Sequence, residues 1–384
     1  MGITNLLVVL EPYLPVYFSG QQVSGHVYIN VSSVTPLKEL VVSVKGNSLV
    51  NWNERHGKST YVYRAEEIYF NTSTIVWNGA DYDSKMQGGD FKFPFSIVLP
   101  GNIPSSFEGT HGNVRYRIKA KAVRSMKFDV KHTTYFSVNT LLDLNCCPAA
   151  KDPVVLREEA TSCVPCLSAG PVIVSLALSK AGYVPGETLL LNGEIRNNSN
   201  SDIISSNVDI VQTISYITKE KIRDEKRVVQ NIAGPYLAAG GSYSWNNAAM
   251  TVPAVVPSQL IHCNIINVSY SLMFSSKQVC CKQVKVHQPI IIGSIPLAGG
   301  LTTTLRPSAP VLASPGTVPQ FTIVGATAPE ILPEEYDLPP SYNEAVGDGT
   351  YRPHHSPCMF SSTGQAGDVP EGWTPTYLTY HGHV

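Results

Sequence analysis

The sequence has few charged residues and lacks the common catalytic motifs. Asp, Glu, Lys and Arg make up 15% of the 384 residues, and the formal net charge is −1. This balance gives no indication of a surface for nucleic acid. A phosphate-binding Walker loop, a His-Glu-x-x-His zinc motif and a Gly-x-Ser-x-Gly nucleophile elbow are all missing. We therefore expect a protein that is not an enzyme, uses no cofactor or metal, and has no nucleic-acid partner.

The sequence also lacks long apolar segments. No run approaches the ~18 residues of a membrane-spanning helix, and the first residues show neither the positive charge nor the apolar stretch of a signal peptide. We expect a cytoplasmic protein whose eight cysteines are reduced. The alternative is a secreted, disulfide-bonded β-sandwich protein, which free thiols at Cys263, Cys280 and Cys281 would exclude.

What the sequence does contain, through residue 297, is alternation. Apolar side chains occupy every second position in residues 23–31, 40–45 and 61–65, and a period of two is typical of half-buried strands. Turn dipeptides, among them Asn78-Gly79 and Pro185-Gly186, separate the runs. No comparable stretch shows a helical period with caps at both ends. The pattern predicts an all-β fold built from β-sandwiches.

Two short patterns occur twice, in the same order. The Tyr-x-x-Gly turn at residues 17–20 resembles the one at residues 183–186, and the Pro-x-x-x-Pro-Ser pattern at residues 100–105 resembles the one at residues 253–258. Self-similarity of this kind indicates a repeated structural unit. The sequence therefore predicts two domains of one type.

We expect the first domain at residues 1–142, an interdomain linker at residues 143–170 and the second domain at residues 171–297. Beyond them, residues 298–384 are rich in Pro, Gly, Thr, Ser and Ala, contain no lysine, and hold two basic and eight acidic residues. A segment of this composition buries too little apolar surface to offset the entropy of ordering it. We expect a disordered, acidic tail of the kind that binds partners.

The tail contains a Pro-Pro-x-Tyr motif, Pro339-Pro340-Ser341-Tyr342. Consecutive prolines pre-order a polyproline II turn, so the turn loses little entropy when it docks in an aromatic groove of a WW domain. The Tyr342 ring would fill a second pocket with its hydroxyl free to hydrogen-bond. We expect Pro339, Pro340 and Tyr342 to bind a WW domain.

The predicted linker contains four cysteines: Cys146, Cys147, Cys163 and Cys166. Four thiolates can hold zinc, but adjacent cysteines such as Cys146 and Cys147 rarely point toward one metal ion. Reversible acylation or inert thiols are the interpretations we favour, and we predict no metal site.

Several of these stretches resemble one family. The longest is residues 93–120, with Phe-Pro-Phe-Ser-Ile-x-Leu-Pro followed by Ile-Pro-Ser-Ser-Phe-Glu-Gly-x-His-Gly-x-Val-Arg-Tyr. With the strand that begins at Leu6, the two Tyr-x-x-Gly turns and the Pro-Pro-x-Tyr tail, it resembles the arrestin-domain-containing proteins, or α-arrestins. The resemblance covers residues 6–297 and the tail motif. It implies two tandem immunoglobulin-like arrestin β-sandwich domains followed by a disordered tail.

The resemblance also implies a function, that of a non-catalytic adaptor. Such proteins carry WW-domain HECT-type ubiquitin ligases to membrane receptor or transporter cargo, whose ubiquitylation drives endocytosis. Pro339, Pro340 and Tyr342 match the ligase-binding motif, and the protein would be cytoplasmic and recruited to the plasma membrane and endosomes. The alternative is a trafficking-coat scaffold like the arrestin-like subunit of retromer, which needs no Pro-Pro-x-Tyr motif.

The chain departs from the family pattern in two places. The first-domain turn reads Ser19-Gly20-Gln21 where the family usually has Pro-Gly-Glu, which predicts a looser turn. Many members also have two complete Pro-Pro-x-Tyr motifs, whereas the second copy here, Thr-Pro-Thr-Tyr at residues 374–377, lacks the first proline. Pro375 and Tyr377 are therefore a candidate second, weak WW site, and its loss would reduce avidity for tandem WW domains.

A row of basic residues offers a candidate cargo or lipid site. Arg115, Arg117, Lys119 and Lys121 share one face of a predicted strand, and apolar residues occupy the other face. Four cations on one face would attract acidic or phosphorylated cargo tails or anionic lipid headgroups. The alternative is an ordinary solvated sheet face.

A second short motif lies early in the tail. Pro307, Ser308, Ala309 and Pro310 match the Pro-Ser/Thr-Ala-Pro ligand of the ESCRT budding machinery. Short matches of this kind arise by chance, so the motif is a hypothesis. It makes ESCRT proteins a candidate partner.

Overall fold

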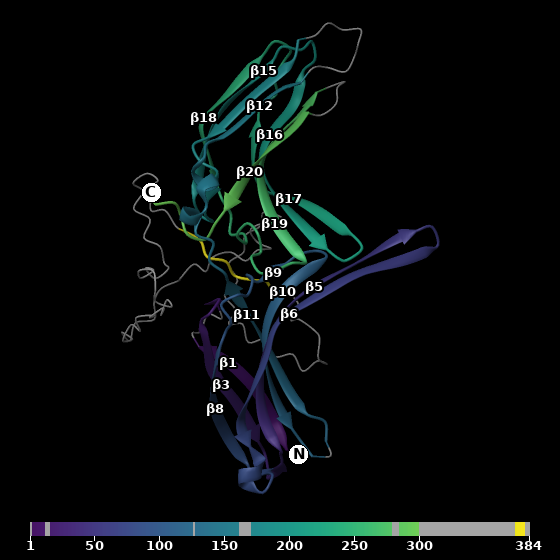
Figure 1. Ribbon diagram of the computed structural model, residues 1–384, viewed down its shortest axis with the longest axis vertical. Helices are drawn as coiled ribbons and strands as arrows, with labels where there is room; N and C mark the ends of the chain where they lie inside the picture. Colours follow the sequence, from purple (N-terminus) through teal and green to yellow (C-terminus); the bar gives the residue numbers. More distant parts are fainter. Residues whose placement is uncertain are drawn as a thin grey trace.

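The computed structural model describes residues 2–11, 16–125, 127–160, 170–278, 284–298 and 373–380. Over these residues the chain forms two β-sandwiches stacked along the long axis of the molecule, with the N-terminal one below and the C-terminal one above in Figure 1. The prediction of an all-β fold with two tandem sandwiches is confirmed.

The N-terminal sandwich is built from two sheets that face each other. Its strands are β1 (Ile3–Glu11), β2 (Val16–Phe18), β3 (Gln22–Val31), β5 (Glu39–His56), β6 (Ser59–Asn78), β8 (Gly89–Val98), β9 (Phe107–Glu108), β10 (Gly112–Val123) and β11 (Val130–Asn139). One sheet has the order β1-β3-β8 and the other β2-β11-β10-β5-β6, with β9 paired to β10. A small pair, β4 (Thr35–Pro36) with β7 (Lys85–Met86), and the 3-10 turn η1 (Gly79–Tyr82) close one end.

The C-terminal sandwich repeats this plan. Its strands are β12 (Val154–Ala160), β13 (Val172–Leu178), β14 (Gly182–Tyr183), β15 (Thr188–Asn197), β16 (Ile203–Ile217), β17 (Ile222–Gly234), β18 (Ser242–Thr251), β19 (Ile266–Gln278) and β20 (Val284–Ile292). The sheet orders are β12-β13-β15-β18 and β14-β20-β19-β16-β17. In both sandwiches a short strand joins the last long strand in parallel, β2 beside β11 and β14 beside β20. The two predicted domains of one type are therefore present.

Equivalent side chains hold equivalent positions in the two copies. The hydroxyl of Tyr116 on β10 donates to the carbonyl of Pro104 at 2.6 Å, and that of Tyr270 on β19 donates to the carbonyl of Val256, also at 2.6 Å. Both tyrosines are buried, and a buried hydroxyl needs such a partner because an unsatisfied one is costly. The second repeated pattern thus marks the place where each sandwich fixes a loop against its core.

The turn predicted to be loose is not loose. The amide oxygen of Gln21 accepts a hydrogen bond from the backbone N–H of Phe18 at 2.8 Å, as the carboxylate of Glu187 accepts one from Val184 at 3.0 Å in the second domain. Gly20 supplies the left-handed backbone that the turn needs, with φ of 81°. Gln21 therefore supplies the same acceptor as Glu187, although Glu187 also forms an ion pair with Lys180.

The linker predicted at residues 143–170 is shorter than expected. It begins with two 3-10 turns, η2 (Leu144–Cys146) and η3 (Pro148–Lys151), and then enters β12, which pairs with β13 and so belongs to the C-terminal sandwich. Only Val154 and Leu156 of β12 are buried. Two inward residues are too few to show a period of two, which is why the strand was missed.

The hairpin of β5 and β6 extends beyond its sandwich, to the right in Figure 1. Residues 61–65 were expected to be a half-buried strand. Tyr63 and Ala65 are half-buried, with the Tyr63 ring stacked on Trp52, whereas Tyr61 and Val62 are 52% and 64% exposed. The expected alternation is therefore present at Tyr63 and Ala65, and it is lost at Tyr61 and Val62, nearer the tip of the hairpin.

His132 lies inside the N-terminal sandwich, on β11. Its Nδ1 atom accepts a hydrogen bond from the backbone N–H of Val8 on β1 at 3.2 Å, which links the two sheets. Burial lowers the pKa of His132 below its usual 6.5. The folded protein therefore holds this imidazole in its neutral form.

Acidification below pH 6.5 is expected to destabilise the N-terminal sandwich. The unfolded chain takes up a proton at His132 near pH 6.5 while the folded chain does not, so stability present above that pH is lost as the pH falls, by up to about 1.4 kcal/mol per pH unit. Thermal unfolding between pH 7.5 and pH 5 measures the slope. His132→Gln keeps a hydrogen-bond acceptor that does not titrate, so it should flatten the dependence of stability on pH. An unchanged slope in this variant would contradict the conclusion that His132 causes the dependence.

Candidate functional site

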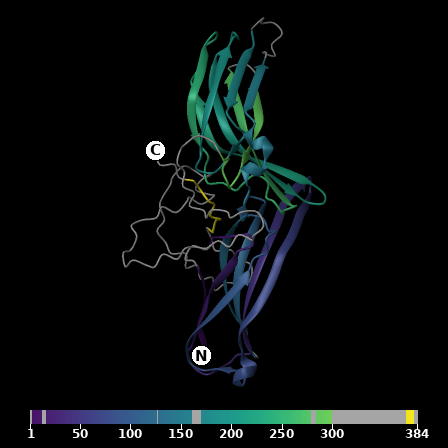
Figure 2. The same cartoon turned by 60° about the vertical axis from the view of Figure 1, so that its left-hand side comes forward.

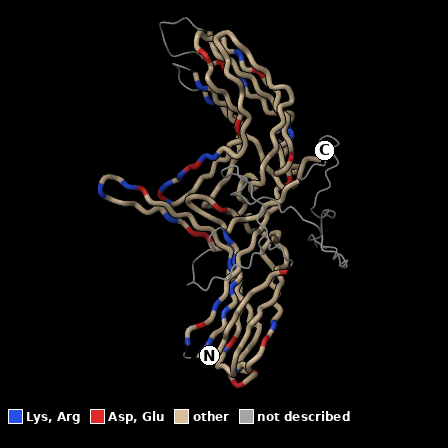
Figure 3. Tube along the Cα trace, turned by 180° about the vertical axis from the view of Figure 1, so that it is seen from behind, with Lys and Arg blue, Asp and Glu red and all other residues tan. Residues whose placement is uncertain are grey.

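The four basic residues predicted to share a face do so on β10. Arg115, Arg117, Lys119 and Lys121 are half-buried and alternate along the strand with fully buried neighbours such as Tyr116. The apolar side points into the sandwich, so the basic side forms the outer face of the larger N-terminal sheet. Figure 3 shows Lys and Arg along the strands of this domain and along the projecting hairpins.

Two of these cations are already paired. Arg115 donates from Nη2 to the carboxylate of Glu108 at 2.7 Å, and the ammonium of Lys121 lies 3.1 Å from a carboxylate oxygen of Asp129. Burial raises the pKa of Glu108, but Arg115 opposes that shift by favouring the ionised carboxylate. Arg115 and Lys121 are therefore poorly suited to attract a separate anion.

Arg117 and Lys119 are different, because neither side chain has an acidic partner among the described residues. The pKa of Lys119 is lowered by burial first and then by the like charges of Lys131, Arg117 and Lys121, a set that Asp129 only partly offsets. Lys131 comes from β11, opposite Lys121 in the register. An anion bound beside Arg117 and Lys119 would offset the repulsion among these like charges.

Polar side chains join the two sandwiches directly. The hydrogen bonds that cross between them join Glu67 to Asn264, Thr110 to Glu225 and Arg227, and Glu54 to Lys221. They connect β6, β9–β10 and the hairpin of β5 and β6 to β17 and to the loop before β19. Charged and polar groups therefore fix one side of the joint between the domains.

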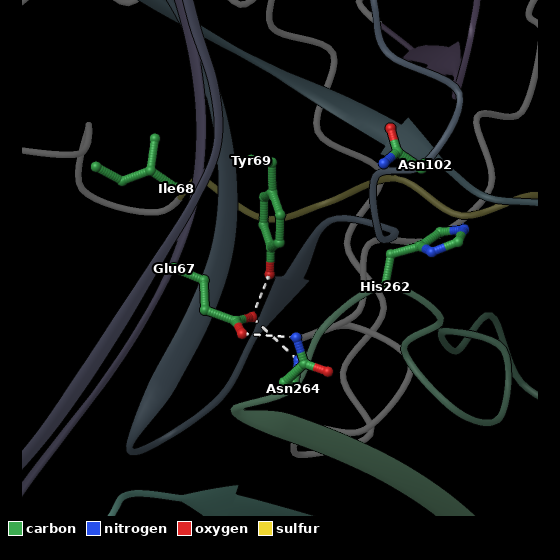
Figure 4. Close-up of a pocket in the computed structure, with 6 residues that line it drawn as sticks. All are labelled: Glu67, Ile68, Tyr69, Asn102, His262 and Asn264. Atoms are coloured by element: carbon green, nitrogen blue, oxygen red, sulfur yellow. Dashed lines mark hydrogen bonds between the residues drawn. The ribbon is translucent and has the colours of Figure 1, made fainter.

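An open hollow of about 590 Å³ lies at this joint, lined by Glu67, Ile68, Tyr69, Asn102, His262 and Asn264. Figure 4 shows Glu67 reaching Asn264, whose backbone and side-chain N–H groups donate to the carboxylate at 3.0 and 2.8 Å. The Tyr69 hydroxyl donates to Ser48 at 2.8 Å. Within the hollow, the Glu67–Asn264 hydrogen bonds join the two domains, whereas the Tyr69 bond to Ser48 stays inside the N-terminal domain.

The other side of the joint is closed by residues 373–380, which we call the strap (Figure 2, yellow). Its first half lies on β11 of the N-terminal sandwich. The Trp373 ring packs 5.6 Å from that of Tyr135, the N–H of Thr376 donates to Ser137 Oγ at 3.0 Å, and the Asn139 side chain donates to the Thr376 carbonyl at 3.3 Å. Tyr135, Ser137 and Asn139 are alternate residues, so they share the outer face of β11.

The second half of the strap reaches the C-terminal sandwich. The backbone N–H of Tyr380 donates to the Pro185 carbonyl at 2.9 Å, and its hydroxyl donates to the Ser294 carbonyl at 2.6 Å. The Tyr380 ring packs in a small apolar cluster with Leu144 and Val184. The strap therefore contacts both domains within eight residues.

Tyr377 lies between these two halves and is 2% exposed. Its hydroxyl donates to the carbonyl of Ser106 in the N-terminal domain at 3.0 Å. Pro375 and Tyr377 were the candidate weak WW site, and in this structure the Tyr377 ring is inside the protein and out of reach of a WW domain. The predicted disorder of residues 298–384 is accordingly wrong for residues 373–380.

The remaining predicted tail sites, Pro339, Pro340, Tyr342 and residues 307–310, lie outside the described residues and stay predictions. Of the cysteines that the structure describes, Cys146, Cys147 and Cys263 are free thiols. Cys163, Cys166, Cys280 and Cys281 are outside the described part of the chain.

Metal clusters and membrane-spanning helices are both missing from the described part of the chain. No three His, Cys, Asp or Glu side chains among the described residues come close enough to hold a metal ion. None of the described helices has the length and apolarity needed to span a membrane.

Comparison with known proteins gives matches over both sandwiches. Residues 6–145 match the family "Arrestin (or S-antigen), N-terminal domain", and residues 168–297 match "Arrestin (or S-antigen), C-terminal domain". The chain is 31% identical over 324 residues to arrestin domain-containing protein 17 of Caenorhabditis elegans, covering 80% of this chain and 74% of that protein. It is 28% identical over 356 residues to human arrestin domain-containing protein 4, covering 89% and 81%.

Removal of the Glu67 carboxylate is expected to loosen the polar side of the joint. Glu67→Ala leaves the backbone N–H of Asn264 without its acceptor, so its amide should exchange about fivefold faster, as for loss of a part-exposed hydrogen bond worth about 1 kcal/mol. Hydrogen exchange followed by NMR measures this. Glu66→Ala is the matched control, since Glu66 lies next on β6 and pairs with Lys45 of its own domain. Equal exchange in the two variants would contradict the role of Glu67.

Proposed function

Because this chain belongs to the arrestin family, with both its N-terminal and C-terminal domains matched, we propose that it is a non-catalytic adaptor in membrane-protein trafficking. It recruits WW-domain HECT-type ubiquitin ligases to membrane receptor or transporter cargo, and ubiquitylation of the cargo promotes its endocytosis. The adaptor works in the cytoplasm and is recruited to the plasma membrane and endosomes.

The observation that carries the proposal is the presence, in one chain, of an arrestin body and the sequence Pro339-Pro340-Ser341-Tyr342. The prolines favour polyproline II without help from a folded scaffold, and the tyrosine completes the WW ligand. The body supplies the cargo contact and the tail supplies the ligase contact, so catalysis comes from the partner.

The cargo contact is proposed at Arg117 and Lys119. Their lack of an acidic partner in the described residues, together with the nearby charge of Lys131, supports binding of an acidic or phosphorylated cargo tail. Buried alternate residues fix the register of the strand that carries them. An extended peptide could therefore lie along it with its anionic groups toward the cations.

The ESCRT-like motif at Pro307, Ser308, Ala309 and Pro310 is retained as a proposed second partner site in the tail. ESCRT binding would place the adaptor on endosomes as well as at the plasma membrane. A trafficking-coat scaffold is the competing function, and it differs from the proposal in needing no Pro-Pro-x-Tyr motif.

The ligase contact is tested by Tyr342→Ala in the full chain. We expect at least a roughly tenfold loss of affinity for a recombinant WW domain and loss of cargo ubiquitylation in cells, because the tyrosine pocket is left empty. Tyr336→Ala, six residues earlier in the same acidic stretch, is the control and should change neither. Cargo uptake that survives Tyr342→Ala would favour the coat scaffold instead.

The cargo contact is tested by Arg117→Glu combined with Lys119→Glu. Binding of an acidic peptide from a cargo tail should fall about tenfold, and its dependence on salt should weaken because two charge contacts are lost. Lys219→Glu with Lys277→Glu makes the same change in net charge at exposed positions of the C-terminal domain. If both double variants weaken binding equally, the face on β10 is not the site.

A further inference from the structure

The strap docks against a glycine of the C-terminal domain whose lack of a side chain leaves room for the strap backbone. Gly186, in the Tyr-x-x-Gly turn of the C-terminal domain, has φ of 87°, and a Cβ atom there would overlap the carbonyl oxygen of Tyr380. Gly20, at the equivalent position of the N-terminal domain, has φ of 81°, but the nearest atom to its Cβ position is 3.8 Å away. The two turns need glycine for their backbone, and only the second needs it for the approach of another segment.

The two tyrosines of the strap anchor it to different domains. The Tyr377 hydroxyl donates to Ser106 and the Tyr380 hydroxyl to Ser294, in each case to a backbone carbonyl. Ser294 also meets the start of the interdomain connection, because its N–H donates to the carbonyl of Leu142 at 2.9 Å and its hydroxyl accepts from the N–H of Leu142 at 2.6 Å. The strap thus lies against the place where the chain crosses between the domains, so it restricts their relative rotation.

We propose that the strap holds the two sandwiches in one orientation, and that docking of the strap and capture of Pro375 and Tyr377 by a WW domain exclude each other. The Tyr377 ring cannot fill its site against Ser106 and the tyrosine pocket of a WW domain at once. The choice of a WW domain as the partner of the strap rests on the proposed function, in which the same class of ligase domain binds Pro339-Pro340-Ser341-Tyr342.

Mutual exclusion makes ligase binding and domain orientation thermodynamically linked. A WW domain that binds only the released strap shifts the equilibrium toward release, and a docked strap lowers the apparent affinity by the same factor. A first WW domain held at Tyr342 raises the effective concentration of a second one on the same ligase, which offsets the missing first proline of the strap motif. Loading of a tandem-WW ligase therefore frees the two domains to reorient.

The test uses the full chain carrying Tyr342→Ala, so that the strap is the remaining WW ligand. Gly186→Ala is added to expel Tyr380, and Gly20→Ala is the matched control with the same backbone strain and no strap contact. The affinity of a recombinant WW domain from a HECT-type ligase is measured by calorimetry, and exchange of the Thr376 and Tyr380 amides is measured by NMR.

We expect Gly186→Ala to raise the WW affinity roughly tenfold or more and to remove the protection of both amides, while Gly20→Ala changes neither. Tyr380→Ala removes the contact of the strap with Leu144 and Val184 and leaves the sequences of both sandwiches and of residues 374–377 unchanged, so it should give the same result if Gly186→Ala fails to fold. In the chain without a glycine substitution, saturating WW domain should speed exchange of the Leu142 and Ser294 amides.

The inference and the function it rests on fail in different ways. If the chain with Tyr342 intact binds the WW domain, but release of the strap leaves the affinity of the Tyr342→Ala chain unchanged, the strap is a structural element only and the inference is overturned. If the chain with Tyr342 intact binds no WW domain, the proposed function is overturned, and the partner assigned to the strap falls with it.

Discussion

The arrangement of the two sandwiches depends on the contacts that side chains make across the joint between them. The buried apolar side chains of the two sandwiches form one continuous cluster, and Tyr216 and Ile266 of the C-terminal sandwich lie against Gly109 and Gly112 of the N-terminal one. Polar contacts on one side, centred on Glu67 and Asn264, and the strap on the other, through Tyr377 and Tyr380, add to this packing. The polar side is partly exposed and weak per bond. The strap adds two buried aromatic rings, whose removal from water gives it most of its contribution.

The sequence predicts whatever a period of two or a repeated pattern can encode. The buried set on β3, the alternation on β10 and the duplicated turns all appear where expected. Features that depend on pairing between residues far apart in the sequence could not be predicted. Lys131 joins the basic face only through the register of β11, and β12 has too few inward residues to be recognised. Trp373, Tyr377 and Tyr380 lie close together near the end of the chain, and that clustering of aromatic residues was the one available signal for the strap.

In the proposal above, residues 374–377 serve both binding and structure, and the structural role accounts for the incomplete motif. A full Pro-Pro-x-Tyr motif needs only to suit a WW groove, whereas residues 374–377 must also fit against β11 and Ser106. The Thr376 backbone donates to Ser137 and accepts from Asn139, so both of its polar groups are bound to β11. On this account the motif at residues 339–342 binds the ligase, and the motif at residues 374–377 couples ligase binding to reorientation of the two sandwiches.

The most direct measurement of this coupling is the distance between one spin label on each sandwich, recorded by pulsed electron paramagnetic resonance as a tandem-WW ligase fragment is added. The account predicts one narrow distribution in the free protein and a broader or displaced one when both WW domains are bound. It also predicts that Tyr377→Ala gives the second distribution without any ligase. A single distribution that neither the ligase nor this substitution changes would contradict it.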